Sequence, residues 1–404
     1  MHSKKLVVLL ACAVTVQMVI ASAATARPAW KKKIDRAIGG HALSVEIATP
    51  SDTLYQHNAA TQHIPASNQK LLLSMALLDR FGSGMRLSTT VHGQRPRSGV
   101  VQGNVWIVGR GDPTVTGGGS YGRSLPFKAT GLRKLAAKIK QAGVNVITGR
   151  VVGSTTYFSH DWFAPGWKSD FPAEEVALPS AVAIDGNTHK DKHISNPEYR
   201  AAKALTAKLR QIGVLVADSP KAGTVPRHKP RLAKVMSQPL KVLMRYMDRQ
   251  SSNFFAEELG KRLSVTSYGA PGTIAHAAAA IRAWTASHGV SITAYDSSGL
   301  SYDNRVSPAG IVSLLRFATG QSWGKKLRSD LAAGGQGTLE DRLKDVRIRA
   351  KTGTLDNISA LSGWLWAKPL QDWVEFSILS GGMPKYQAAA IEDRIVRVSA
   401  HSAH

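Results

Sequence analysis

The sequence predicts an α+β protein in which a domain of helices and strands is interrupted by a β-rich insert. Helix-like and strand-like segments occur on both sides of residues 88–236, whereas that stretch consists mainly of short strand-like runs between Gly- and Pro-rich loops. The chain has 404 residues, of which 43% are apolar and 20% charged. This length fits two to three domains, and the composition is that of a globular protein with a sizeable core.

The first 26 residues have the three parts of a secretory signal peptide. A short basic start (residues 1–5) precedes an apolar run (6–20), and two A-x-A cleavage sequences follow at 21–26. The sequence therefore predicts an exported protein of the periplasm or extracytoplasmic cell envelope. The single cysteine, Cys12, lies in this segment. A lipoprotein signal ending at Cys12 is an alternative that leaves a very short apolar core. Otherwise the mature chain has no thiol, which excludes disulfides and cysteine nucleophiles.

The chain is strongly basic, with 52 Lys and Arg against 27 Asp and Glu and a formal net charge of +25. Such a surface favours polyanions, which include nucleic acid, an anionic cell envelope and acidic glycans. The basic residues are dispersed and form no recognisable nucleic-acid motif. We therefore expect no nucleic-acid partner and at most peripheral association with the envelope. No later stretch approaches the ~18 apolar residues of a transmembrane helix.

The periodicity of apolar residues predicts the elements in order. Residues 41–64 are typical of two strands joined by a turn, and residues 67–81 predict a nearly all-apolar, central helix. Within 88–236, one clear helix is expected over 132–141, and the turn-rich stretch 222–231 is expected to be the return linker. The later predicted elements are helices over 239–263 and 273–288, strands near 347–353, 360–366 and 374–380, and a helix over 385–398. We divide the mature chain into a discontinuous domain, 27–87 plus 237–404, and an accessory insert, 88–236.

Ser67 and Lys70 form a Ser-x-x-Lys motif at the start of the predicted central helix. The motif alone is weak, because about one or two matches are expected by chance; a second match begins at Ser322, in a segment that we assign to a solvated loop. At a helix start, the i, i+3 spacing places Lys70 beside Ser67, near backbone N–H groups that favour an anion. A lysine inside an apolar helix is costly without a function. The structural alternative is an N-capping serine followed by a lysine that reaches solvent.

Two further motifs follow in order. Ser251 and Asn253 form the only Ser-x-Asn of the chain, in a segment with a helical pattern, where a polar helix or turn face is the alternative. Lys351, Thr352 and Thr354 belong to a Lys-Thr-Gly-Thr sequence after a strand-like stretch, where an ordinary turn is the alternative. The order S-x-x-K, S-x-N, K-T-G is that of penicillin-recognising serine enzymes. Three ordered matches are far less frequent by chance than any one of them.

Other patterns carry no chemistry in this interpretation. Glycine-rich residues 117–122 match a dinucleotide fingerprint and a nucleophile elbow, but they neither end a strand directly nor open a clear helix. We interpret them as a flexible surface loop. The thirteen histidines form no H-E-x-x-H or comparable cluster, so we expect no metal and no cofactor.

The motifs together resemble the D-alanyl-D-alanine carboxypeptidase/endopeptidases, the class C low-molecular-mass penicillin-binding proteins. The matching stretches, within about residues 35–395, are 65–70 (PASNQK), 109–113 (GRGDP), 296–301 (DSSGLS), 307–308 (SP), 337–339 (GTL) and 350–355 (AKTGTL). The resemblance implies a penicillin-recognising serine transpeptidase/β-lactamase-like domain with helices on an antiparallel sheet. The long gap between Ser67 and Ser251 is similar to members with domains inserted there, although this insert is modest. Ser252 stands where some relatives have Asp.

The resemblance implies that Ser67 is a nucleophile and that Lys70 is its base, since no Ser-His-Asp order is visible. Lys70 must be neutral to accept a proton, so its pKa must fall from ~10.4 toward 7–8. Burial and the charge of Lys351 act in that direction. We assign the neutral form to Lys70 and the positive charge to Lys351. Lys351 would then bind the substrate carboxylate, to which the hydroxyls of Thr352 and Thr354 would donate.

The remaining roles also follow from the resemblance. Ser251 would pass a proton to the leaving D-alanine, and Asn253 would orient the substrate amide. The backbone N–H groups of Ser67 and Thr354 would form the oxyanion hole. The implied substrates are peptidoglycan stem peptides and crosslinks, with β-lactams as covalent inhibitors.

Three alternatives remain open at this point. A serine β-lactamase or esterase would share the motifs, a catalytically silent wall-binding protein would share the fold, and a secreted nucleic-acid binder is supported by charge alone. We interpret Glu257 and Glu258 as helix-surface charges with no route to an acyl ester. A penicilloyl-enzyme should therefore persist, unlike that of a β-lactamase.

Overall fold

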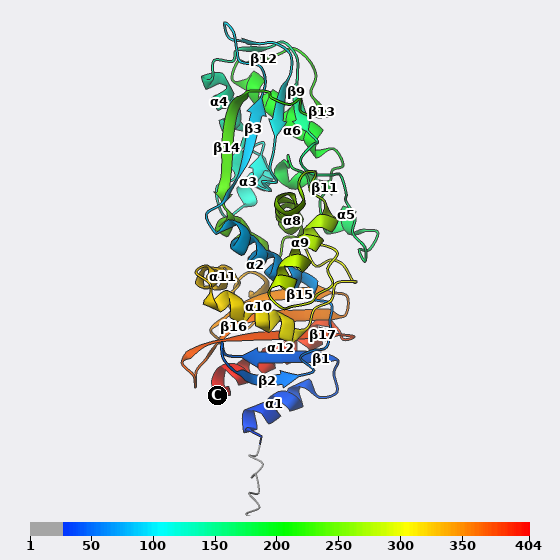
Figure 1. Ribbon diagram of the computed structural model, residues 1–404, viewed down its shortest axis with the longest axis vertical. Helices are drawn as coiled ribbons and strands as arrows, with labels where there is room; N and C mark the ends of the chain where they lie inside the picture. Colours follow the sequence, from blue (N-terminus) through cyan, green and yellow to red (C-terminus); the bar gives the residue numbers. More distant parts are fainter. Residues whose placement is uncertain (1–26) are drawn as a thin grey trace, which may run out of the picture.

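The computed structural model describes residues 27–404. The predicted signal peptide, with Cys12, lies outside the described residues. Among residues 27–404, no helix combines the length and the apolar character needed to cross a membrane. The described chain is elongated, with α1 (Ala29–Ile38) at one end and α4 (Leu132–Gln141) near the other (Figure 1).

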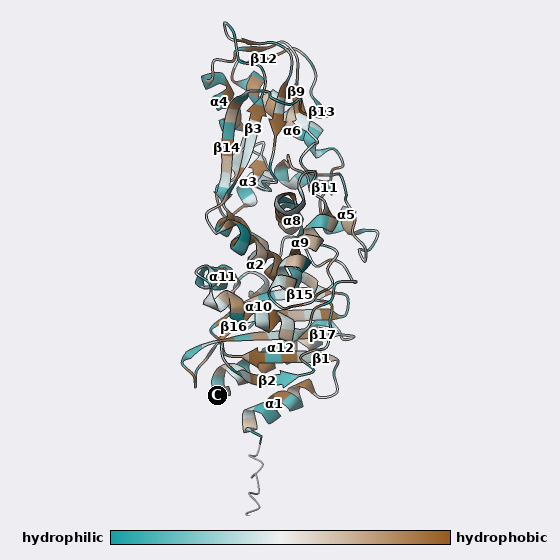
Figure 2. Cartoon of the chain, viewed as in Figure 1, coloured by the Kyte–Doolittle hydropathy of each residue, from teal (hydrophilic) through white to brown (hydrophobic). Residues whose placement is uncertain are grey.

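A five-stranded antiparallel sheet combines residues from both sides of the insert. Its strands in spatial order are β15 (Ile348–Leu355), β16 (Ile358–Ala367), β17 (Asp372–Gly381), β1 (Leu43–Ala48) and β2 (Thr53–His57). Because β1 pairs with β17 along its whole length, the segments before and after the insert form one sheet. β15 and β2 are the edge strands, and β2 is largely hydrophilic beside the more apolar β1 (Figure 2).

Different helices cover the two faces of this sheet, because alternate residues of its strands point to opposite sides. Leu361 and Leu365 of β16 share a buried core with α1 and α12 (Lys385–Ser402). Ala360 and Trp364 of the same strand belong to the core on the other face. The helices of that face are α2 (Gln69–Phe81), α7 (Leu240–Gln250), α8 (Asn253–Tyr268), α9 (Ile274–Ser287), α10 (Pro308–Gly320) and α11 (Gly324–Asp330). The predicted α+β arrangement of helices on an antiparallel sheet is confirmed.

The insert contains a second five-stranded sheet, of mixed direction. Its strands in spatial order are β13 (Lys221–Gly223), β9 (Val151–Ser154), β5 (Val105–Val108), β3 (Arg86–His92) and β14 (Arg231–Pro239). β5 and β13 both run parallel to β9, because α4 and α6 (Pro197–Gln211) provide the crossovers between them. The helix predicted over 132–141 is observed with these bounds, whereas α6 and α1 were not predicted.

The remaining elements are short. They are the parallel strands β12 (Leu215–Val216), β8 (Val146–Ile147) and β4 (Val100–Val101), the pairs β6 (Val115–Thr116) with β7 (Thr130–Gly131) and β10 (Thr188–His189) with β11 (Lys192–His193), helices α3 (Ser120–Ser124) and α5 (Phe171–Glu174), and the 3₁₀ turns η1 (Ala66–Asn68), η2 (Asp185–Asn187) and η3 (Gly337–Leu339). The interpretation of residues 117–122 as a loop without a helix was wrong, because α3 begins within them.

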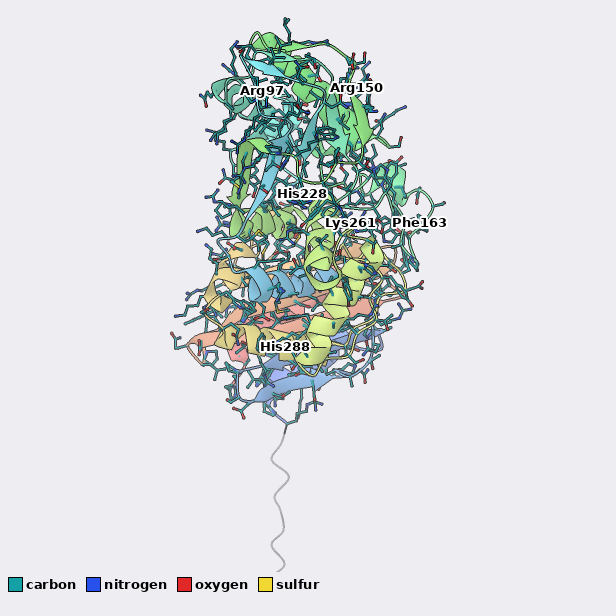
Figure 3. All side chains as sticks on the ribbon, turned by 45° about the horizontal axis from the view of Figure 1, so that its top comes forward. Arg97, Arg150, Phe163, His228, Lys261 and His288 are labelled. Carbon is teal, nitrogen blue, oxygen red and sulfur yellow. The ribbon has the colours of Figure 1, made fainter. Side chains whose placement is uncertain are left out.

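Residues 156–196 lie against α8, and a buried lysine holds them there. Lys261 of α8 is fully buried and donates to the carbonyl oxygens of Ser159 (2.9 Å) and Pro179 (3.3 Å), and it also pairs with the Asp161 carboxylate. Figure 3 shows Lys261 in the middle of the molecule. Since a buried cation needs partners to offset its lost hydration, these contacts fix part of the insert over the helix that begins at Asn253.

Candidate active site

The nucleophile predicted from sequence, Ser67, lies in the 3₁₀ turn η1 immediately before α2. Asn68 fixes this turn to the sheet, because its side-chain amide donates to Ser362 Oγ of β16 at 3.1 Å. Lys70, in the first turn of α2, is fully buried, and its Nζ lies 2.9 Å from Ser67 Oγ. The predicted i, i+3 pair is therefore in contact, and the alternative of a lysine that reaches solvent is wrong.

Lys70 Nζ has two further partners, Asn253 Oδ1 at 2.7 Å and the carbonyl oxygen of Ser298 at 2.6 Å. Burial lowers the pKa of Lys70 to about 8, while the carboxylates of Asp296, Glu257 and others oppose this shift. The ammonium group is thus held in one position but loses its proton more readily than that of a solvent-exposed lysine. These are the requirements for a general base.

Ser251 lies at a break between two helices. The sequence predicted one helix over 239–263, and this was wrong, because α7 ends at Gln250 and Ser251 adopts a left-handed conformation (φ 56°). Ser252 then caps α8, accepting a hydrogen bond from the Phe255 N–H at 3.3 Å. The break places Ser251 in the cleft beside Lys351, whose Nζ donates to Ser251 Oγ at 2.9 Å.

Lys351, on β15, is the second buried lysine of the site. Its Nζ also donates to the carbonyl oxygen of Thr352 at 2.7 Å. Burial lowers the pKa of Lys351 to about 7, the charge of Lys70 adds to this effect, and Asp248 opposes it. Both lysines of the site therefore lose a proton more readily than a solvent-exposed lysine does. More carboxylates support the charge of Lys70 than support that of Lys351.

The edge strand β15 passes close to Ser67 and has backbone N–H groups that point away from β16. The N–H of Ala350 points away from β16, since it donates to Ala332 O at 2.9 Å. Successive N–H groups of a strand point to opposite sides, so those of residues two or four apart point to the same side. The N–H of Thr354 therefore also points away from β16. Gly353 brings this strand close to η1, and a Cβ atom there would lie 3.0 Å from Ser67 N. The backbone nitrogen of Ser67 therefore lies close to β15, beside the residue that precedes Thr354.

The predicted residues meet in a single cleft of about 1190 Å³. The residues from the sequence motifs that line it are Ser67, Ser251, Asn253, Thr352 and Thr354, with Lys70 and Lys351 buried behind them. Thr352 Oγ1 donates to Thr338 Oγ1 at 2.7 Å, so the stretch 337–339 also reaches the cleft.

Two comparisons of sequence agree with this geometry. The model of the D-Ala-D-Ala carboxypeptidase 3 (S13) family matches residues 31–193 and 190–402. A curated relative, "Carboxypeptidase DacB" from Mycolicibacterium smegmatis, is 30% identical over 343 residues, which cover 78% of this chain and 71% of the relative. The chain belongs to the S13 family. A further relative, "D-alanyl-D-alanine carboxypeptidase" from Actinomadura sp., is 24% identical over 463 residues, covering 92% of this chain and 83% of the relative.

Solved structures show the same fold. Penicillin binding protein 4 (dacB) from Haemophilus influenzae matches with a TM-score of 0.75 at 20% identity, over 91% of this chain and 97% of that one. This S13 protein therefore has the fold that the resemblance implied, in which an insert separates the first two motifs.

Sequence reasoning missed the acidic residues behind Lys70. Glu257 and Glu258 were interpreted as surface charges, and this was wrong, because both are fully buried. Glu257 Oε1 accepts from the N–H groups of Ser297 (3.0 Å) and Ser298 (2.7 Å), and so holds the residue whose carbonyl oxygen contacts Lys70. Burial raises the pKa of Glu257 to about 7. The stretch 296–301 was quoted as a matching motif, but only the fold shows what it contacts.

The rim of the cleft also contains residues that the motifs did not indicate. Lys168, from the insert, pairs with Asp356, which follows β15, and its ammonium lies 5.4 Å from the centre of the Tyr302 ring. Glu175 lies beside Asn253, whose side-chain amide donates to the Glu175 carbonyl oxygen at 3.1 Å. The insert therefore contributes one side of the cleft, which short motifs around the nucleophile could not reveal.

Proposed function

We propose that this protein is a serine D-Ala-D-Ala carboxypeptidase and D,D-endopeptidase that cleaves peptidoglycan stem peptides and crosslinks through an acyl-enzyme at Ser67. The observation that carries the proposal is the contact of Ser67 Oγ with Lys70 Nζ at 2.9 Å, at the base of a cleft whose opposite wall carries Lys351. Membership of the S13 family supports the reaction, and the predicted signal peptide supports an extracytoplasmic location.

Substrate binding begins at β15, the strand that carries Lys351. The terminal carboxylate of the substrate approaches Lys351 and the hydroxyls of Thr352 and Thr354. An opposite charge at this distance raises the pKa of Lys351 and keeps it protonated. Two nearby cations disfavour each other, so the charge on Lys351 favours the neutral form of Lys70. Substrate binding thus favours a charged Lys351 and a neutral Lys70, the protonation states that were predicted from the sequence.

Acylation follows at the start of α2, where Ser67 and Lys70 lie. Lys70 Nζ accepts the proton of Ser67 while Oγ bonds to the carbonyl carbon of the penultimate D-Ala. The N–H groups of Ser67 and Thr354 stabilise the oxyanion. Ser251 passes a proton to the nitrogen of the leaving D-Ala as the peptide bond breaks, and Asn253 orients the substrate amide.

Water then hydrolyses the resulting ester, which releases the shortened peptide and restores the Ser67 hydroxyl. A β-lactam reacts with Ser67 in the same way, but its opened ring remains attached and occupies the cleft. A Haemophilus influenzae homologue of the same fold has been solved in complex with a β-lactam. Glu257 and Glu258 do not line the cleft, so neither is placed to activate water for rapid hydrolysis of a penicilloyl ester.

The test is covalent labelling with fluorescent penicillin, together with mass analysis of products from purified muropeptides. Ser67→Ala should abolish both the label and the loss of D-Ala, with an unchanged thermal unfolding midpoint. Ser322→Ala is the matched control, because Ser322 begins the second Ser-x-x-Lys sequence and is exposed. Label that persists in Ser67→Ala would show that the nucleophile is another residue.

A further inference from the structure

The interpretation of the basic residues as dispersed was wrong, because the positive charge of the chain is concentrated in one part of the insert. Residues 86–155 and 197–239, here called the basic module, contain twenty Lys and Arg but only three Asp and Glu. The whole chain has 52 and 27. Arg97 and Arg150 of the module lie at the end of the molecule opposite to the region of His288 (Figure 3). The charge is therefore a local property of this end of the protein.

The three acidic residues do little to offset this charge at the surface. Asp112 is buried, and its carboxylate accepts from Thr114 and Thr130. Glu198 is buried against His160. Asp218 is the only one of the three that is not buried, and it already pairs with Arg150 at 2.9 Å. The surface of the basic module thus presents many cations and a single, occupied carboxylate.

Part of this charge surrounds a cavity of about 630 Å³ between α4 and β14. Arg86, Lys128, Arg133 and Lys134 line it, and no Asp or Glu does. All four side chains are exposed, and none forms an ion pair with any residue in the range 27–404. Arg86 Nη1 donates to the Ser237 carbonyl oxygen at 2.7 Å, which fixes the guanidinium at the wall of the cavity.

We propose that this cavity binds phosphate groups of a phosphodiester-linked polyanion of the cell envelope, and that the basic module thereby attaches the enzyme to its substrate layer. Arginine and lysine bind phosphate through charge-assisted hydrogen bonds, and a repeating polyanion gains affinity by releasing counterions at each contact. The exposed cations on the rest of the module extend this interaction along the polymer. The choice of an envelope polymer rests on the proposed function.

Nucleic acid carries the same phosphate chemistry but fits the surface less well. Proteins that bind single strands combine a basic groove with exposed aromatic side chains on which bases stack. Among the exposed large apolar side chains of residues 27–404, the basic module contributes only Leu215 and Met236, neither of which is aromatic. The surface therefore offers charge without stacking.

The experiment measures binding of fluorescent poly(glycerol phosphate) to the mature protein at several salt concentrations. The test variant is Lys128→Gln/Arg133→Gln/Lys134→Gln. The matched control is Lys31→Gln/Lys32→Gln/Lys33→Gln, which removes the same charge from α1 at the other end of the molecule. At about 100 mM salt, we expect the test variant to lose about tenfold or more in affinity and to show a shallower salt dependence. The control should lose less than about threefold.

Both variants should keep penicillin labelling of Ser67 and release of D-Ala from a soluble peptide, because none of the substituted residues lines the catalytic cleft. Equal losses in the two variants would overturn the proposal in favour of diffuse net charge. Tighter binding to a DNA oligonucleotide or to anionic lipid vesicles than to the polymer would overturn the choice of partner. Failure of the catalytic proposal would appear instead as absent labelling with polymer binding intact.

Discussion

The two walls of the catalytic cleft are built in different ways. The helix wall is formed by η1 and the start of α2, and the strand wall is formed by β15. On the helix wall, Lys70 contacts Ser67, Asn253 and the carbonyl oxygen of Ser298, so its ammonium has three fixed partners. On the strand wall, Lys351 has two partners, and the exposed Thr354 belongs to an edge strand. The three contacts of Lys70 exist before substrate arrives. On the strand wall, the Thr354 hydroxyl has no hydrogen-bond partner among residues 27–404, whereas the Thr352 hydroxyl donates to Thr338.

This difference suggests a division of work. A base and nucleophile gain from a fixed geometry, because misplacement of the reacting atoms by even 1 Å is costly. A carboxylate-binding wall needs unpaired donors, because a donor already satisfied by the protein gains little from a ligand. The helix wall should therefore control the rate of acylation with every substrate. The strand wall should control which substrates are accepted.

The largest effect is expected on the helix wall. Lys70→Ala should lower the rate of acylation by about 10²–10⁴-fold, the usual contribution of a general base, with penicillin and with ester substrates alike. Stopped-flow labelling with fluorescent penicillin measures this rate. A loss confined to substrates with a terminal carboxylate would contradict the assignment of Lys70 as the base.

Substitution on the strand wall should be selective. Lys351→Ala should lower kcat/KM for D-Ala-D-Ala peptides by about 10- to 100-fold, the value of a charge-assisted hydrogen bond. A thioester or ester without the carboxylate should lose less than about tenfold. Steady-state kinetics with the two substrates gives the comparison. Equal losses of kcat/KM with the two substrates would mean that Lys351 does not act specifically on the substrate carboxylate.

The pH dependence follows from the state of Lys70. Its pKa is about 8, and only the unprotonated form accepts the proton of Ser67. Acylation by a carboxylate-free ester should therefore rise about tenfold per pH unit below this value and level off above it. Substrates with a carboxylate should also show a fall at higher pH, as Lys351 loses its proton. If the acylation rate with the carboxylate-free ester also falls over the same alkaline pH range, the fall is not caused by deprotonation of Lys351.

The residues of the strand wall were easier to predict from sequence than the residues that hold Lys70 in place on the helix wall. Lys351, Thr352 and Thr354 alternate along one strand, so a local pattern gives their relative positions. The break at Ser251 was missed because the apolar periodicity continues from α7 into α8. The burial of Glu257 was missed because its partners, Ser297 and Ser298, are 40 and 41 residues away along the chain. Local periodicity carries no information about such distant contacts.

The same limit applies to the insert. The periodicity of residues 132–141 gave α4 correctly, since its buried positions repeat at helical spacing. The side of the cleft formed by Lys168 and Glu175 could not be predicted, because these residues lie in or beside short loops without a pattern. Their positions depend on contacts such as the buried Lys261, which holds the segment against α8.

The smallest predicted effect tests how the helix wall sets the pKa of Lys70. The negative charge of Glu257 raises that pKa, and the pKa of Glu257 itself is about 7, so Glu257 is largely ionised where Lys70 titrates. Glu257→Gln retains an oxygen that can accept from the N–H groups of Ser297 and Ser298 but removes the charge. The pKa of Lys70 should fall. The midpoint, the pH at which the acylation rate reaches half its maximum, should therefore move to lower pH by a fraction of a unit. Acylation at pH ~7.5, where most Glu257 is ionised and most Lys70 is protonated, should then be about twofold faster.

Glu258→Gln is the matched control, because Glu258 is equally buried on the same helix but contacts Ser180 and is not among the charges that shift Lys70. Its midpoint should stay at the wild-type value. A shift of the Glu257→Gln midpoint to higher pH would mean that loss of geometry at Ser298 outweighs loss of charge. Equal shifts in both variants would mean that general loosening of α8, rather than the charge of Glu257, controls the base. Either result would mean that the charge of Glu257 does not determine the pKa of Lys70.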